Sequence, residues 1–259
     1  SWSFSFDIFK EAEAVILSPS SGTKEVLITI CGHLFLGVVE SVSRQYSFES
    51  SSYSCSGRSI SAYLTSPYVI TRDYIQSEQL SAIQLAEEEL QGFAGWTIDW
   101  QFSTDPIIPN GTLKYTGKTP LQAIQYIAEG VGSNVQPDSV NKVLHIVPQY
   151  QYSPWLWHNQ VPDFFVPIST TISKNISRQD NPLYEHIYCI GETNGIIMRV
   201  TKQGTAGIIL HDQFIHPLIC DTTAALEVGR IKLSERGRED TYTLEPVSYT
   251  HLTLPTICS

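Results

Sequence analysis

Apolar and polar residues alternate in the first part of the chain. Trp2, Phe4, Phe6 and Ile8 occupy every second position, which is the period of a strand buried on one face. Further strands are predicted over 25–31, 34–43 and 52–61. The pattern over residues 1–65 therefore predicts a small antiparallel β domain.

The clearest helix signal lies in the middle of the chain. Thr119 suits an N-cap, Pro120 suits the first helical position, and Gln122 completes a capping box. Apolar side chains then recur at helical spacing, at Leu121, Ile124, Ile127 and Ala128. The pattern predicts a helix that ends at Gly130 or Gly132, followed by strands over 133–136 and 143–147.

An earlier segment carries a similar signal. A helix is predicted over 77–91, with Ser77 as its cap and Gly92 after its end. Its buried stripe is Leu80, Ile83, Ala86 and Leu90, and Glu87–Glu89 are expected to face water. A strand over 95–102 and an Asn110-Gly111 turn follow. We therefore predict two small α/β modules inserted between β regions.

The last third of the chain returns to strands. They are predicted over 168–176, 184–190 and 196–201, with an Asn194-Gly195 hairpin turn between the last two. A final helix is predicted from Asp221 or Thr222 to near Gly237, with one side formed by Leu226, Gly229, Arg230 and Leu233. Extended structure resumes over 242–244.

These elements predict an α+β fold of antiparallel, barrel-like β domains with two inserted α/β modules. The expected boundaries are 1–65 for the first β domain (a partial barrel), 66–151 for the inserted modules, and 152–246 for the return strands and a second, incomplete β domain. Residues 247–259, VSYTHLTLPTICS, resemble a translated sequencing-adaptor tail and are interpreted as non-native. We interpret the chain as a fragment that lacks segments at both ends.

Composition narrows the classes of function. Charged residues make up 16% of the 259 residues, against roughly 25% in ordinary soluble domains. The net charge of −10 argues against a surface that grips phosphates, so specific nucleic-acid binding is not expected. No apolar run reaches the ~18 residues that a membrane helix needs. The low charge favours β domains that bury surface against protein partners.

The five cysteines form no CxxC pair. Cys31, Cys189 and Cys220 each stand beside apolar residues, which is typical of buried thiols. We predict free core thiols rather than a disulfide framework.

Candidate chemistry is sparse. His211, Asp212, His216 and Cys220 lie within ten residues and offer ligand types that suit zinc, but their spacing matches no zinc pattern and Pro217 interrupts them. We favour polar loop residues there and predict no metal site.

Enzyme signatures are equally weak. Asp99 stands alone in a strand, whereas a glycosidase needs two carboxylates across one bond. Ser59 lacks the second glycine of a nucleophile elbow. The sequence contains no phosphate-binding glycine loop, so no cofactor and no catalytic residue are predicted.

Two further groups of residues allow alternatives. Trp155 and Trp157, with Tyr150 and Tyr152, are able to stack on sugars, although covering the core where modules join is the favoured role. The arginines Arg58 and Arg72 are candidates for ion pairs between subunits, although solvation is commoner.

The order of these features resembles that of phage tail hub proteins of the Mu baseplate type. The first β domain carries the hairpin glycines Gly32 and Gly37 and the strand end Ser56-Gly57-Arg58 within ITICGHLFLGVVESVSRQYSFESSSYSCSGRSISAYL. The inserted module matches in TGKTPLQAIQYIAEGVGSNVQPDSVNKVLHIVPQY followed by SPW.

The return strands and last helix match in NPLYEHIYCIGETNGIIMRVTKQGTAGIILHDQFIHPLICDTTAALEVGR. The GTAG turn departs from the family pattern, because Ile208 and Ile209 follow it where an acidic residue is usual. The resemblance covers most of 2–245.

The resemblance implies a structural role. Hub proteins of this type form trimeric rings between the tail tube and the tip or spike, with two β barrels in each subunit. It implies a non-enzymatic homotrimer in the virion tail, assembled in the host cytoplasm, whose partners are the tube and the tip or spike proteins. A carbohydrate-binding module that uses Trp155 and Trp157 and a virion-associated hydrolase are the alternatives.

Overall fold

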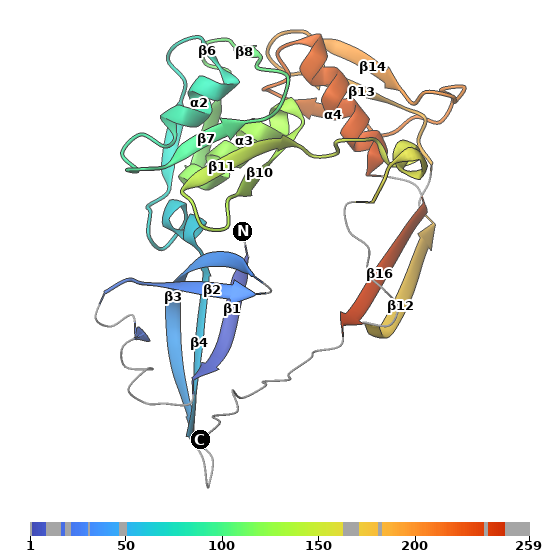
Figure 1. Cartoon of the computed structure of the whole chain (residues 1–259). Helices are drawn as coiled ribbons and strands as arrows, with labels where there is room; N and C mark the ends of the chain where they lie inside the picture. The colour runs from blue at the N-terminus through green and yellow to red at the C-terminus, as the bar shows by residue number, and fades with distance from the viewer. Residues whose placement is uncertain are drawn as a thin grey trace.

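The computed structural model describes residues 2–8, 17–18, 22–30, 32–46, 51–162, 171–180, 183–235 and 238–246. Its fold is mixed α+β, with several small sheets (Figure 1). Within these ranges no sheet closes into a barrel, so the barrel form of the β domains stays a prediction. The predicted tail at 247–259 lies outside the described residues.

The first sheet contains the four strands predicted for residues 1–65. They are β1 (Ser3–Ile8), β2 (Lys24–Ile30), β3 (His33–Tyr46) and β4 (Ser51–Ser59), in the antiparallel order β1-β4-β3-β2. β3 pairs with β2 over residues 33–39 and with β4 over residues 37–46. The register between β3 and β4 shifts by one residue between Val39 and Ser41, as at a β-bulge.

One face of this sheet forms a separate core. Ile8, Val39, Tyr53 and Cys55 are buried there, with Phe4 and Phe6 packed against them. Since alternate residues of a strand share a face, this core is the direct result of the alternating pattern.

A short 3₁₀ helix, η2 (Ile60–Leu64), leads from this sheet into the α/β region. The next elements are β5 (Arg72–Ile75), β6 (Leu80–Ser81), α2 (Ala82–Glu88), β7 (Thr97–Trp100), β8 (Ile107–Ile108), β9 (Lys114–Lys118), α3 (Pro120–Val131), β10 (Ser133–Pro137) and β11 (Val143–Pro148). The segments that we treat as two modules share the sheet β10-β11-β7, in which β7 runs parallel to β11. They also share one hydrophobic core.

The predicted capping of α3 is confirmed. Thr119 and Gln122 form the capping box, Pro120 is the first helical residue, and Gly132 ends the helix with φ 84°. A left-handed C-cap favours glycine because glycine has no Cβ to clash.

The predicted start of α2 is wrong. Ser81, not Ser77, is the N-cap, and Gln84 completes its capping box. Leu80 and Ser81 pair with Ile107 and Ile108, so residues 80–81 are held in a strand and the helix begins only afterwards. Of the predicted stripe, Ala86 and Leu90 are buried, whereas Leu80 and Ile83 are only partly buried and Ala82 and Leu85 complete the buried side.

The last region begins with η3 (Pro154–Asn159) and contains the mixed sheet β14-β13-β15. Its strands are β13 (His186–Gly191), β14 (Ile197–Thr201) and β15 (Phe214–His216). The helix α4 (Thr222–Ser234) packs on this sheet, and the side chain of Asp221 caps it as predicted. Leu226, expected on the buried side of α4, is 44% exposed.

A separate two-stranded antiparallel ribbon completes the described structure. Its strands are β12 (Thr171–Asp180) and β16 (Arg238–Pro246), and every described side chain of β12, over 173–179, is exposed. Figure 1 shows the ribbon apart from the helices and from the first sheet.

The α/β region contacts the last region at a glycine, Gly130 of α3. A Cβ at Gly130 of α3 would stand 2.6 Å from Leu218 Cβ and 2.7 Å from the His216 ring. Such distances are impossible, so the absence of a side chain allows α3 to approach this segment closely.

Candidate assembly interface

Two of the three glycines in the resemblance motifs, Gly37 and Gly57, make room for an aromatic ring. Phe4 of β1 lies over Gly37 and Gly57, where an added Cβ would come within 2.4 Å and 2.6 Å of its ring. A Cβ at Gly57 would also stand 2.0 Å from Val38 O. These two positions therefore need glycine for packing rather than for turn geometry.

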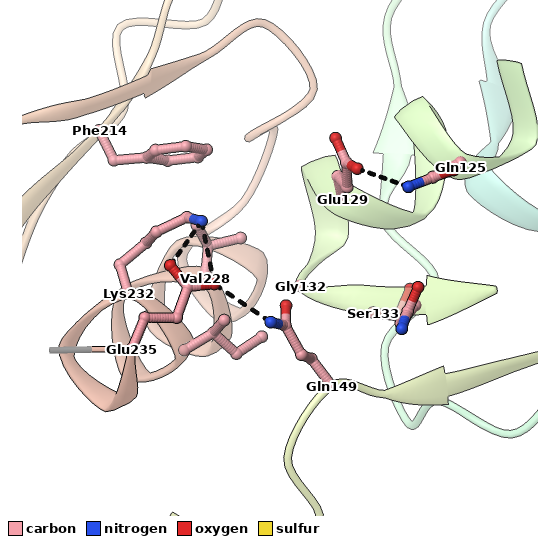
Figure 2. Close-up of a pocket in the computed structure, with 11 residues that line it drawn as sticks. Gln125, Glu129, Gly132, Ser133, Gln149, Phe214, Val228, Lys232 and Glu235 are labelled. Carbon is pink, nitrogen blue, oxygen red and sulfur yellow. Dashed lines mark hydrogen bonds and ion pairs between the residues drawn. The ribbon is translucent and has the colours of Figure 1, made fainter. Parts of the chain in front are cut away.

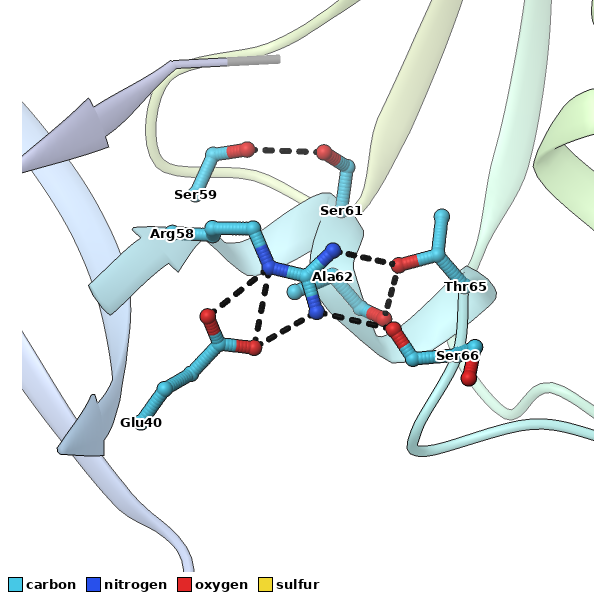
Figure 3. A network of polar contacts seen from close by, with 7 residues as sticks. All are labelled: Glu40, Arg58, Ser59, Ser61, Ala62, Thr65 and Ser66. Carbon is cyan, nitrogen blue, oxygen red and sulfur yellow. Dashed lines mark hydrogen bonds and ion pairs between the residues drawn. The ribbon is translucent and has the colours of Figure 1, made fainter.

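Arg58 ties the first sheet to the linker that follows it (Figure 3). Its Nε and Nη2 donate to the Glu40 carboxylate at 2.6–2.9 Å, Nη1 donates to Thr65 Oγ1 at 3.1 Å, and Nη2 donates to Ser66 O at 2.9 Å. The planar guanidinium allows these bonds to form together. The predicted candidate for an ion pair between subunits is thus engaged within its own chain.

Arg72 also has an internal partner. It forms an ion pair with Glu89 at 2.7 Å, and Tyr115 donates a hydrogen bond to the same carboxylate group. Glu89 is 3% exposed, so the prediction that it faces water is wrong. Burial, with the Glu89 hydrogen bond second, raises the pKa of Tyr115 and keeps its hydroxyl protonated.

The tip of the hairpin formed by β2 and β3 is apolar and exposed. Residues 26–39 contain no Asp, Glu, Lys or Arg. Leu27 and Ile30 are each 57% exposed and Leu34 is 44% exposed. β2 is also an edge strand within the described sheet, so one side of its backbone has no strand partner there. We call this hairpin tip, with Leu27, Ile30 and Leu34, the apolar tip.

The sequence suggested that Asp99 stands alone, but the structure gives its carboxylate side-chain partners. The parallel pairing of β7 with β11 places it opposite His145, whose Nδ1 lies 2.8 Å from Asp99 Oδ2. Asp138 Oδ2 lies 3.6 Å from Nε2 of the same ring. Hydrogen bonds from Gln101 and then His145 lower the pKa of Asp99. A glycosidase acid needs the opposite shift, so Asp99 is unsuited to that role.

The residues considered for zinc do not converge. The His211 ring packs on Tyr184 and bonds Asp212 O, whereas His216 is buried against Tyr126. Among the described residues no group of three or more His, Cys, Asp or Glu side chains could hold a metal ion.

Other predicted residues have plain structural surroundings. Ser59 is fully buried and shares a hydrogen bond with Ser61 at 2.8 Å. Cys55 and Cys189 are buried free thiols, which confirms the prediction for them, and Cys220 is a half-buried free thiol. Cys31 and Cys258 lie outside the described residues. No helix in the described ranges is both long and apolar enough to cross a membrane.

The two tryptophans at the exit of the α/β region have different surroundings. Trp155 packs against the core of the last region, and Lys202 Nζ lies 4.9 Å from the centre of its ring. Trp157 is 55% exposed. The core-covering role favoured from sequence holds for Trp155 only.

A polar cleft of about 290 Å³ lies between α3 and α4 (Figure 2). Its polar groups largely bond one another: Glu235 pairs with Lys232 at 2.9 Å and accepts from Gln149 at 3.1 Å. Gln125 donates to Glu129 at 3.1 Å. The hydrogen bond from Gln149 to Glu235 thus links the residue after β11 to the residue after α4.

Comparison with known proteins finds structures that share the fold of this chain, but it finds no sequence family. No protein-family model matches the chain, and no curated protein matches it. Among solved structures, a prophage MuSo2 43 kDa tail protein from Shewanella oneidensis matches with TM-score 0.60 and 15% identity over 93% of this chain and 73% of that one.

Two further tail proteins match at similar levels. A tail protein from Neisseria meningitidis matches with TM-score 0.57 and 15% identity over 87% of this chain and 65% of that one. The prophage tail protein gp18 from Listeria monocytogenes matches with TM-score 0.57 and 14% identity over 89% and 67%. This chain shares its fold with prophage tail proteins. The resemblance in feature order is confirmed at the level of fold, and the chain spans about two thirds of the length of the Neisseria protein.

Proposed function

We propose that this protein is a structural component of a phage or prophage tail and acts there as a baseplate hub. The observation that carries the proposal is the fold shared with prophage tail proteins over 87–93% of the chain. The described residues that sequence analysis considered for catalysis have structural partners instead, as the Ser59 and Asp99 contacts illustrate. In this proposal the protein works by assembly and not as an enzyme.

The proposed domains are 1–65, 66–151 and 152–246, with 247–259 as a non-native tail. We propose that the first and last are β barrels in the assembled protein. The exposed ribbon of β12 and β16 supports this view, because a two-stranded sheet alone is only marginally stable in water. In this proposal the ribbon gains further strand partners in the assembled protein.

The proposed assembly is a homotrimeric ring in the virion tail, formed in the host cytoplasm, between tail tube and tip or spike proteins. The apolar tip supports a contact between subunits. Leu27 and Leu34 lie on one face of a charge-free hairpin and Ile30 lies on the other, and the edge strand β2 offers backbone hydrogen bonds. A second copy of the chain that covered it would remove this apolar surface from water and pair the edge.

The test compares the protein from the intact gene with variants of the apolar tip. Leu27→Glu combined with Ile30→Glu places two charges in the proposed contact. Ile208→Glu is the matched control, because Ile208 is 78% exposed and lies in another region. We expect light scattering after gel filtration to give a trimer for the parent and the control, and a folded monomer for the double variant.

Circular dichroism would verify that the double variant keeps its strands and helices. A parent protein that stays monomeric at micromolar concentration would contradict the ring. A double variant that remains trimeric would contradict the role of the apolar tip.

A further inference from the structure

A shallow groove lies on the loop that leaves the α/β region. Its volume is about 410 Å³, within the range of roughly 300–1,000 Å³ found for small-molecule sites. Its walls come from 151–162, and the lining residues are Gln151, Tyr152, Trp157, Gln160, Val161 and Pro162. None of these side chains carries a charge at neutral pH.

An aromatic platform forms one wall of the groove. Trp157 and Tyr152 are 55% and 44% exposed, although large aromatic side chains normally bury most of their surface. The indole Nε1 of Trp157 donates to Tyr152 O at 2.9 Å, and the Tyr150 ring packs 6.3 Å away at 51°. These contacts orient the indole while more than half of its surface remains open.

Two amide side chains flank this platform. Gln151 and Gln160 are both exposed, and each amide supplies two N–H donors and one carbonyl acceptor. A ring that presents C–H groups on its face and hydroxyls on its rim matches an aromatic surface bordered by amides. The lack of charge favours a neutral ligand over a phosphorylated or acidic one.

We propose that this groove binds a neutral carbohydrate, with one pyranose ring stacked on Trp157 and its hydroxyls bonded to Gln151 and Gln160. Trp155 takes no part, since it packs against the core of the last region. The site is independent of the trimer proposed above, because the groove is built from a single segment of one chain.

Proline-rich peptides also bind grooves lined by Tyr and Trp. The Trp157 indole N–H is already bonded to Tyr152 O, so it is not free to donate to a carbonyl group of such a peptide. The remaining ring face and the amides suit a polyhydroxylated ring better.

The test uses nuclear magnetic resonance of the protein labelled with ¹⁵N at its tryptophan indoles. The probes are chitotriose, cellotriose and maltotriose, with a proline-rich decapeptide as the alternative ligand. We expect at least one trisaccharide to shift the Trp157 indole resonance in a saturable way. Trp157→Ala should weaken binding by about tenfold or more, and Trp157→Phe should retain part of it.

Tyr46→Ala is the control, because Tyr46 is an exposed aromatic residue of the first sheet, 70% exposed. Its affinity should equal that of the parent. The proposal is overturned if no trisaccharide shifts the resonance, if Trp157→Ala binds as the parent does, or if only the peptide binds. None of these outcomes bears on the trimer, whose test is the molecular mass.

Discussion

At the scale of single residues, His216 couples the stability of the protein to pH. Burial lowers its pKa to about 4, from an ordinary value near 6.5. Its ring packs against Tyr126 and Phe214, and Nδ1 accepts a hydrogen bond from Leu218 N at 3.2 Å. Gly130 of α3 lies against the same ring, so this neutral imidazole is part of the contact between the α/β region and the last region.

Between about pH 4 and pH 6.5, the His216 imidazole is therefore neutral in the folded state but protonated in the unfolded chain. As pH falls from about 6.5 to about 4, the unfolded state binds more protons, and the free energy of unfolding should decrease by about 3 kcal/mol. Below the folded-state pKa the decrease from this residue should stop. Urea denaturation at several pH values measures this dependence.

His216→Phe should reduce that pH dependence while keeping an aromatic ring in place. His158→Phe is the control, because His158 is exposed in η3. A His216→Phe variant with an unchanged pH dependence over this range would contradict the assignment.

The Glu89 carboxylate shows why some residues could not be placed from sequence. Three consecutive glutamates at the end of an amphipathic helix pattern indicate a solvated face. The structure separates them: Glu87 is exposed, Glu88 accepts from Tyr74 OH, and Glu89 is buried beside Arg72. The partners of Glu89 lie 17 and 26 positions away, so no local pattern reveals them.

At the scale of elements, local signals predicted α3 well because its cap, first turn and end all depend on neighbouring residues. The same holds for the hairpin of β13 and β14 and for the Asp221 cap of α4. The parallel pairing of β7 with β11 was not predicted, because it joins segments separated by about 46 positions. That pairing merges the two predicted modules and creates the Asp99–His145 contact.

The N-cap of α2 provides a direct test of the structure against the sequence pattern. Ser81 Oγ accepts from Gln84 N, whereas Ser77 is exposed outside the helix. We expect Ser81→Ala to lower the free energy of unfolding by about 1 kcal/mol, and Ser77→Ala to change it by less than about 0.5 kcal/mol. Chemical denaturation of both variants measures the difference. An equal effect at the two positions, or a larger one at Ser77, would place the helix start where the sequence pattern put it.

At the scale of the whole molecule, the described protein leaves sheet edges and apolar strand residues open. The first sheet ends in β1 and β2, each of which has a described strand partner on one side only, and its apolar tip is exposed. The ribbon of β12 and β16 is exposed along 173–179. Meanwhile the arginines considered for contacts between subunits are bound within the chain. If the protein assembles as proposed, open sheet edges and apolar surface, rather than ion pairs of Arg58 and Arg72, are the groups from which we expect the proposed ring to form.

Electron microscopy of the protein expressed from its intact gene tests this central claim most directly. The hub proposal predicts particles that average to a closed ring with threefold symmetry, with the β domains of neighbouring subunits in contact around it. Averages that show isolated single chains, open filaments or a ring without threefold symmetry would contradict it.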